Sequence, residues 1–186
     1  GDIRVVNTGD GTKPYGIVIN SKGIPWFNLF GTNKIAHIDP ATMVVTTIDL
    51  PDARARGRRI AVTSDDVIWY TDYTRGFLGR VDPRTNQVTE IPMPAGAGSL
   101  PYGMASDDKD RIWVTISTRV KNWMHALRVD LADGYLARYE SGAFRIVADG
   151  FRFTNEIRFD AREEFLYVVE TTGGCITRLR IDDAGN

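Results

Sequence analysis

The residues best suited to chemistry recur at one place in a repeated pattern. Phenols can exchange protons, guanidiniums pair with carboxylates or phosphates, and amide and carboxylate oxygens can bind hard cations. All of these groups stand at the starts of four repeats, in the dipeptides Tyr15-Gly16, Arg58-Arg59, Tyr102-Gly103 and Asn155-Glu156. If the fold brings these four starts together, the sequence predicts a small-molecule site there.

The repeat itself is marked most clearly by tryptophans. Trp26, Trp69 and Trp113 follow one another at intervals of 43 and 44 residues, and one four-stranded propeller blade takes about 40 to 50 residues. A fourth, looser copy follows after about ten extra residues, with Leu166-Tyr167-Val168 in the tryptophan strand. The sequence therefore consists of tandem copies of one small unit.

Each unit is expected to be a meander of β-strands. Apolar residues alternate with polar ones in stretches such as 34–38 and 88–91, which is the period of a strand, and no window shows a helical stripe. Asp39-Pro40-Ala41-Thr42 recurs as Asp82-Pro83-Arg84-Thr85, and Asp followed by Pro predicts a type I turn between two strands. The fold class is thus all-β: a β-propeller with about four four-stranded blades.

The composition limits the possible partners. The 186 residues are 42% hydrophobic and carry a net charge of −1, which gives no general attraction to nucleic acid or to an acidic membrane surface. The single Cys175 excludes an internal disulfide, and no apolar run is long enough to span a membrane. A soluble protein is expected, without a signal peptide in this chain, and its compartment stays open.

Residues 1–186 are expected to form a single propeller domain that is incomplete at its C-terminus. Four blades and a leading strand, Ile3-Arg4-Val5-Val6, account for the sequence, and four blades is the low end for propellers. Asp182-Asp183-Ala184-Gly185 looks like a turn whose next strand would follow. The prediction is a ring of six or seven blades.

The meander also predicts which loops share a face. Alternate connections emerge on opposite faces of the disc, so the starts of the innermost strands surround one mouth of the central channel. The turns at Lys22-Gly23 and Asp65-Asp66 belong to the other face. Two alternatives stay open: the tyrosines could merely cap the core, and the arginines of 54–59 could form a solvated loop.

Further candidates flank this mouth. Asp72 and Glu170 occupy equivalent ends of second strands, and about four extra residues between Trp113 and Asp130 lengthen a loop on the same face. This loop offers Arg119 and Trp123 for substrate contacts, and His125 as the one histidine suited to base chemistry, because His37 lies away from the channel. The alternative is a mobile surface insertion.

Residues 10 to 116 resemble the virginiamycin B (streptogramin B) lyase family. The similarity lies in Pro14-Tyr15-Gly16-Ile17, Trp26-Phe27 and Trp69-Tyr70-Thr71-Asp72. The resemblance implies a propeller that opens the ester bond of a cyclic depsipeptide by Mg²⁺-assisted elimination. It also implies a site role for Tyr15, the tyrosine of the first Pro-Tyr-Gly.

Residues 126 to 185 resemble the gluconolactonase and senescence marker protein family. The similarity lies in the stretches 148–157 and 165–171, including Phe153-Thr154-Asn155-Glu156-Ile157. The resemblance implies a six-bladed propeller that hydrolyses sugar lactones with one divalent ion, usually Ca²⁺, in its channel. Asn155 would be a ligand of that ion, with Glu156 beside it.

Three functions follow as hypotheses. The first is a propeller that cleaves a lactone or ester with Ca²⁺ or Mg²⁺ in the channel mouth, polarising the carbonyl. Its roles fall to Asn155 and Glu156 as ligands, to Tyr15, Glu170 and His125 in catalysis, and to Arg58, Arg59, Tyr102, Arg119 and Trp123 in substrate binding. The second is a streptogramin-type elimination. The third is a non-catalytic propeller that binds a ligand or a protein at one face.

Overall fold

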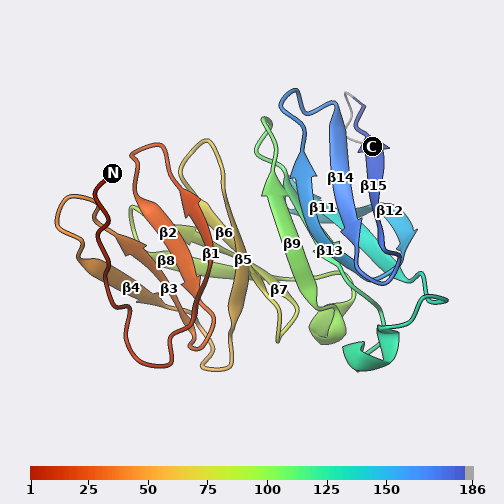
Figure 1. Ribbon diagram of the computed structural model, residues 1–186, viewed down its shortest axis with the longest axis horizontal. Helices are drawn as coiled ribbons and strands as arrows, with labels where there is room; N and C mark the ends of the chain where they lie inside the picture. Colours follow the sequence, from red (N-terminus) through yellow and green to blue (C-terminus); the bar gives the residue numbers. More distant parts are fainter. Residues whose placement is uncertain (183–186) are drawn as a thin grey trace.

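The computed structural model describes residues 1–182, and their strands form four antiparallel sheets (Figure 1). Neighbours along the chain are neighbours in each sheet. The first sheet contains β1 (Pro14–Ile19), β2 (Pro25–Leu29), β3 (Lys34–Ile38) and β4 (Val45–Asp49). The second contains β5 (Gly57–Val62), β6 (Ile68–Asp72), β7 (Phe77–Asp82) and β8 (Gln87–Pro92).

The third sheet also has four strands, and the fourth shows three strands within the described residues. The third contains β9 (Pro101–Ser106), β10 (Ile112–Ile116), β11 (Gly134–Glu140) and β12 (Ala143–Phe151). The fourth contains β13 (Thr154–Phe159), β14 (Phe165–Glu170) and β15 (Cys175–Arg180). The predicted all-β propeller with four blades is confirmed.

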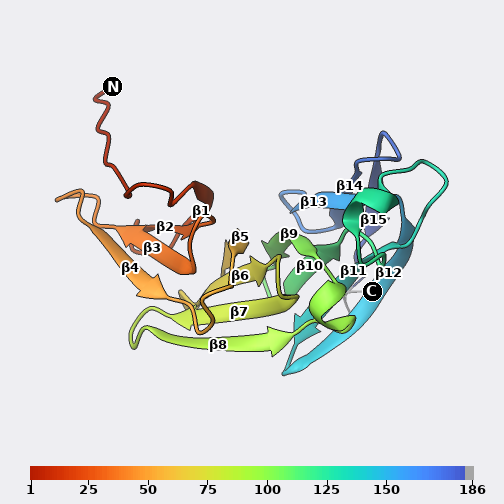
Figure 2. The same cartoon turned by 90° about the horizontal axis from the view of Figure 1, so that it is seen from below.

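The four blades stand side by side around a common axis. Figure 2 shows them in an arc, with the first strand of each sheet on the inner side and β4, β8 and β12 on the outer side. The inner strands contact one another in the order β1, β5, β9, β13. The starts of all four inner strands therefore lie at the same end of the concave side.

The repeated tryptophans hold neighbouring blades together. Trp26 packs in a core with Ile60 of the second blade, Trp69 with Met104 of the third, and Trp113 in a core that includes Ile157 of the fourth. All three tryptophans are at most 8% exposed, and burying a large apolar side chain contributes on the order of 1.5 to 3 kcal/mol. The tryptophan interval equals the blade interval because each tryptophan fills one boundary between blades.

A second set of contacts joins the blades on the face opposite the strand starts. Asp66 accepts hydrogen bonds from the backbone N–H and the hydroxyl of Ser21 at 2.8 and 2.7 Å. Asp110 accepts the same pair from Ser64, and Glu163 accepts from the Asp108 N–H. The three acidic residues have φ between 56° and 66°, a left-handed turn conformation that points each carboxylate back at the preceding blade.

The two Asp-Pro tetrads form the expected turns, with one addition. They connect β3 to β4 and β7 to β8, and the Asp39 carboxylate accepts from the Ala41 N–H at 2.8 Å. The backbone hydrogen bond spans one residue more than the i to i+3 bond of a simple type I turn. It runs from the Met43 N–H to the Asp39 carbonyl, and from the Asn86 N–H to the Asp82 carbonyl. Met43 and Asn86 have φ of 61° and 57°, which returns the chain to the sheet direction.

The N-terminal segment differs from its prediction. Residues 3–6 form no strand, and Ile3 and Val5 are 88% and 89% exposed. A strand needs a neighbour for its backbone donors and acceptors, and these residues have no strand beside them within the described part of the chain. Of the predicted turn at Asp182-Asp183-Ala184-Gly185, only Asp182 belongs to the described residues, and the other three lie outside them.

The long loop of the third blade is larger than expected. β10 ends at Ile116 and β11 begins at Gly134, so residues 117–133 form the connection. The third strand of this blade, β11, therefore begins after Asp130, the residue up to which the extra loop residues were counted in the sequence. The loop carries the 3₁₀ helix η2 (Trp123–Ala126), and a second one, η1 (Gly96–Gly98), precedes β9. No helix in residues 1–182 has the length and apolar character needed to cross a membrane.

Candidate functional site

Each inner strand carries a β-bulge at the dipeptide that the repeat singles out. In β1 the pairing shifts between Pro14 and Ile17, so Tyr15 and Gly16 together face one residue of β2, Asn28. The same shift occurs at Arg58-Arg59, Tyr102-Gly103 and Asn155-Glu156. A bulge bends the strand and re-aims its side chains. The fold therefore places all four dipeptides at equivalent positions beside the channel.

Buried polar side chains on the second strands fix these bulges. Asn28, Thr71 and Thr115 are all 0% exposed. The Thr115 hydroxyl accepts from the Gly103 N–H at 2.8 Å and donates to the Asn155 carbonyl of the next blade at 2.6 Å. Thr71 makes the matching contacts with the Arg59 N–H and the Tyr102 carbonyl, and the Asn28 amide donates to the Arg59 carbonyl. One buried hydroxyl or amide in each of the first three blades thus hydrogen-bonds to the bulge of the following blade.

Two tyrosines and two arginines meet at the centre. The hydroxyls of Tyr15 and Tyr102 lie 3.0 Å apart, although 87 residues separate them in the chain. The Arg59 guanidinium lies 4.7 and 4.9 Å from the centres of their rings, and its Nη2 lies 3.4 Å from the Tyr102 hydroxyl. The Arg58 guanidinium lies 5.3 and 4.6 Å from the same two rings. The structure brings together these four predicted residues, hereafter the central cluster.

The two phenols of the central cluster differ electrostatically. Burial raises the pKa of Tyr15, but its hydrogen bond with Tyr102 and the guanidiniums of Arg58 and Arg59 outweigh burial and bring the pKa below its usual value. Burial and the hydrogen bond with Tyr15 raise the pKa of Tyr102, although both arginines oppose the change. Neighbouring groups whose pKa values are pushed apart are suited to act as base and acid.

Two cavities adjoin the central cluster. The inner cavity, of about 280 Å³, lies along the channel between Tyr15, Arg59 and Glu156, with Met104 and Arg158 further in. The mouth cavity, of about 210 Å³, opens on the side of the strand starts. Its lining contains Arg58, Tyr73, Tyr102, Ser117, Trp123, Phe153 and Asn155. Tyr102 and the arginines thus stand between two hollows that a small molecule could enter.

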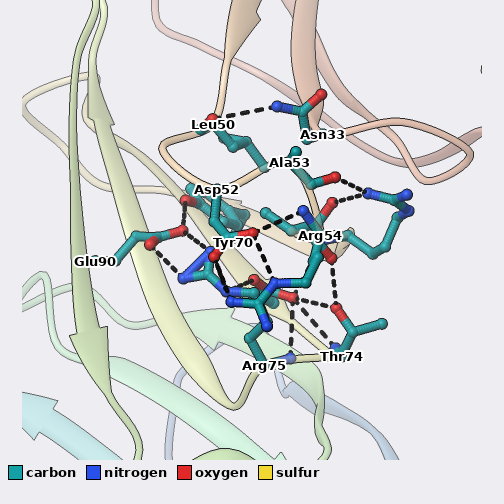
Figure 3. Close-up of polar contacts among 12 residues, drawn as sticks. Asn33, Leu50, Asp52, Ala53, Arg54, Tyr70, Thr74, Arg75 and Glu90 are labelled. Atoms are coloured by element: carbon teal, nitrogen blue, oxygen red, sulfur yellow. Dashed lines mark hydrogen bonds and ion pairs between the residues drawn. The ribbon is translucent and has the colours of Figure 1, made fainter.

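A buried ionic network holds residues 50–56, the link from the first blade that leads into Arg58 and Arg59 (Figure 3). Arg75 pairs with Glu90 at 2.5 Å and with Asp72 at 3.5 Å, and Asp52 of the link lies 3.8 Å away. The Asp72 carboxylate also accepts from the Arg56 N–H of the link at 3.2 Å. Burial raises the pKa of Glu90 despite its pairing with Arg75. The network fixes residues 50–56, so the two arginines that follow start from a defined position.

Glu170 occupies the position equivalent to Asp72, as predicted. Glu170 pairs with Thr154 and Asp72 with Gly57, each at the start of an inner strand. Glu170 is 6% exposed, accepts from the Arg152 N–H at 2.7 Å and is hydrogen-bonded by the Thr177 hydroxyl. Glu170 therefore stabilises the connection before β13 and makes no hydrogen bond to a residue of the central cluster.

The predicted residues of the long loop lie at different places. Trp123 is 38% exposed, lines the mouth cavity and faces Phe153 with ring centres 6.3 Å apart. His125 is exposed, and its Nε2 lies 3.4 Å from the Asn122 amide of the same loop. Arg119 pairs with Asp149 at 2.6 Å and lies over the Tyr135 ring, beside a different hollow. Of the three, only Trp123 borders the cavities next to the central cluster.

The pair expected to bind a cation has other partners. The Asn155 amide nitrogen donates to the Thr171 hydroxyl at 3.1 Å. Glu156 forms an ion pair with Arg59, and Arg158 lies 3.9 Å from it. Residues 1–182 contain no group of three or more His, Cys, Asp or Glu that could hold a metal ion. Glu156 is thus already beside two guanidiniums, and Ca²⁺ or Mg²⁺, which prefer six or more oxygens, would need ligands beyond Asn155 and Glu156.

Some residues of the site were not predicted. Phe30 and Tyr73 place their rings 5.1 and 4.5 Å from the Arg58 guanidinium, and Phe153 lines the mouth cavity. The buried Thr71 and Thr115 were not singled out either. A signal for them exists in the sequence, because two residues after each of the three repeated tryptophans stands Asn28, Thr71 or Thr115, a polar residue in an otherwise apolar strand.

Comparisons with known proteins agree with the fold. The sequence profile of the virginiamycin B lyase family matches residues 2–122, whereas no curated protein matches the chain significantly. A streptogramin B lyase structure superposes with a TM-score of 0.78 at 21% identity, over 97% of this chain and 55% of that one. Both resemblances inferred from the sequence are confirmed, the first by the family profile and the second by likeness of fold.

Two further solved structures are similar. A catalytically inactive virginiamycin B lyase from Staphylococcus aureus with quinupristin gives a TM-score of 0.68 at 19% identity, over 95% of this chain and 58% of that one. A gluconolactonase from Xanthomonas campestris gives 0.71 at 17% identity, over 92% of this chain and 59% of that one. The chain thus spans little more than half the length of these proteins.

Proposed function

Because the chain belongs to the virginiamycin B lyase family, we propose that it cleaves an ester bond of a small molecule by elimination at the channel mouth. The observation that carries this proposal is the central cluster, where Tyr15 and Tyr102 share a hydrogen bond between two guanidiniums. Elimination needs a base that removes a proton from carbon and positive charge near the oxygen that leaves. The central cluster supplies both.

Tyr15 is the proposed base. Its lowered pKa makes the phenolate more available than in a free tyrosine, while Tyr102 stays protonated and donates a hydrogen bond to it. The phenolate takes the proton from the carbon next to the one that bears the ester oxygen. The electron pair of that C–H bond becomes the second bond of a C=C double bond, the C–O bond breaks, and the acyl part leaves as a carboxylate.

Product mass tests the proposal directly. A cyclic depsipeptide such as quinupristin, the molecule bound in the related S. aureus lyase structure, is incubated with the protein. Elimination opens the ring without changing the mass and creates a double bond, whereas hydrolysis adds one water. Tyr15→Phe is expected to lower the rate by about 100-fold or more, in the range for losing a general base. Tyr167→Phe, a similarly exposed tyrosine outside the central cluster, is the control and should keep the rate. Unchanged substrate with the wild-type protein would contradict the proposal.

Hydrolysis of a lactone or ester is the second candidate, favoured by the likeness to a gluconolactonase fold and by Asn155 at the mouth cavity. The same mass measurement separates the two, because hydrolysis adds water. This candidate includes a divalent cation at Asn155 and Glu156. Calorimetric titration with Ca²⁺ and Mg²⁺ tests that part: binding that weakens in Asn155→Ala would support the cation site, and absence of binding would contradict it.

A further inference from the structure

Arg58 differs from the other arginines near the channel in its partners. Arg59 pairs with Glu156, Arg75 with Glu90, and Arg119 with Asp149, whereas Arg58 forms no ion pair with any carboxylate of residues 1–182. Its guanidinium lies instead among four aromatic rings, and its buried Nε, like that of Arg59, has no hydrogen-bond partner. The rings are those of Tyr15, Phe30, Tyr73 and Tyr102, with centres 4.5 to 5.3 Å away.

This arrangement leaves part of the guanidinium's binding capacity unused. Aromatic faces stabilise a cation, but they do not accept its in-plane N–H bonds, which match the two oxygens of a carboxylate. Arg58 is also part of the lining of the mouth cavity. An anion that enters this cavity therefore meets one guanidinium that no carboxylate of residues 1–182 pairs with.

The remaining walls of the mouth cavity are largely aromatic. They are formed by Tyr73, Tyr102, Trp123 and Phe153, with one hydroxyl from Ser117 and one amide from Asn155. Its volume of about 210 Å³ is below the roughly 300 to 1,000 Å³ of sites for drug-sized ligands, so it suits a group about the size of one ring. Flat aromatic walls favour a planar ring by stacking and edge contacts.

We propose that the mouth cavity binds an aromatic carboxylate, with its two oxygens on Arg58 and its ring against the wall that Trp123 and Phe153 form together. The inference rests on the proposed function in one respect: ester elimination releases the acyl part as a carboxylate, and this cavity adjoins the base Tyr15 through Tyr102. Arg58 would then bind the leaving carboxylate and stabilise the charge that develops on it. A phosphate is the less suitable anion, because only one unpaired guanidinium faces the cavity and its other walls are mostly apolar.

Benzoate is the probe, and Trp123 provides the signal. Trp26, Trp69 and Trp113 are 2%, 8% and 0% exposed, whereas Trp123 is 38% exposed and lines the cavity, so a ligand there should change the fluorescence of Trp123 alone. We expect saturable benzoate binding by fluorescence and by calorimetry. Trp123→Phe should abolish the fluorescence change while calorimetry still detects binding.

Variants and analogues test the role of Arg58. Arg58→Gln should weaken benzoate binding about 10- to 100-fold, the range for a hydrogen bond to a charged group. Arg58→Lys, which keeps the charge but loses the paired donors, should weaken it less. Arg84→Gln removes an equal charge from an exposed turn on the opposite face and should leave binding unchanged. Thermal melting checks that each variant is folded, and Arg58→Lys serves as the test if Arg58→Gln does not fold.

Three results would overturn the inference: no saturable benzoate binding to the wild-type protein, equal binding by both Arg58 variants and wild type, or equal binding of the neutral isostere benzamide. Tighter binding of inorganic phosphate than of benzoate would also overturn the inference, because the cavity would then be a phosphate site. Failure of the elimination reaction is a separate outcome. Tyr15→Phe tests that chemistry by product mass, whereas benzoate binding through Arg58 is measured without turnover.

Discussion

Replacing Thr115 by valine removes the hydroxyl that ties the third blade to the fourth while keeping the shape of the side chain. The hydroxyl is 0% exposed and serves two buried backbone groups, the Gly103 N–H at 2.8 Å and the Asn155 carbonyl at 2.6 Å. A buried polar group that loses its partner costs about 1 to 3 kcal/mol. With partial relaxation, we expect Thr115→Val to lower the free energy of unfolding by about 2 to 4 kcal/mol.

The assay is thermal and urea denaturation followed by circular dichroism. For a chain of this length about 1 kcal/mol shifts the midpoint by roughly 2 to 4 °C, so the expected fall is about 5 to 15 °C. Thr115→Ser keeps the hydroxyl and loses only a methyl group, so it should cost about 1 kcal/mol. Thr47→Val, at an exposed position of the outer strand β4, should stay within about 0.5 kcal/mol. If Thr115→Val proves as stable as wild type while Thr115→Ser does not, the hydroxyl does not join the blades and the reasoning is refuted.

Two further predictions concern the contacts between blades. Gly103→Ala would place a Cβ 2.2 Å from the Asn155 carbonyl oxygen, so it should cost about 1 to 3 kcal/mol and displace Asn155. Gly98→Ala meets no atom within 4 Å and is the control in the same melting experiment; equal stability of the two variants would argue against close contact of the bulges. On the opposite face, the hydrogen bonds from Ser21 lower the pKa of Asp66, so its stabilisation is present above the unfolded pKa of about 4 and is lost as the pH falls. Asp66→Asn should therefore cost less than about 1 kcal/mol at neutral pH, because the site is exposed, and the difference should shrink as the pH falls below about 4; a difference that does not change with pH would contradict this assignment.

The repeat pattern allowed the blades and the site positions to be predicted because both depend on periodic residues. Trp26 recurs at each boundary between blades, so its spacing reports the architecture directly. The same period assigned Tyr15, Arg58 and Tyr102 to equivalent strand starts, and their meeting follows from the packing of neighbouring inner strands against one another.

The parts that could not be predicted are those without a periodic counterpart. Nothing in the period reveals that the loop 117–133 runs past Asp130 before β11, because an insertion has no equivalent in the other blades. The ring of Phe153 reaches the mouth cavity from the connection before β13, a position that spacing alone does not orient. The partners of Arg58 and Arg59 depend on rotamers, so only coordinates distinguish the ion pair of Arg59 from the aromatic surroundings of Arg58.

The central claim is that Tyr15 of the first blade and Tyr102 of the third interact across the channel under the influence of Arg58 and Arg59. Spectrophotometric titration of tyrosinate tests it most directly. Wild type should show one tyrosine that ionises below the usual pKa of about 10, and Tyr15→Phe should remove that step. In Tyr102→Phe and Arg58→Gln the step should move to higher pH, because each change removes an interaction that favours the phenolate. A wild-type protein in which no tyrosine ionises below the usual value, or a low step that persists in Tyr15→Phe, would contradict the account.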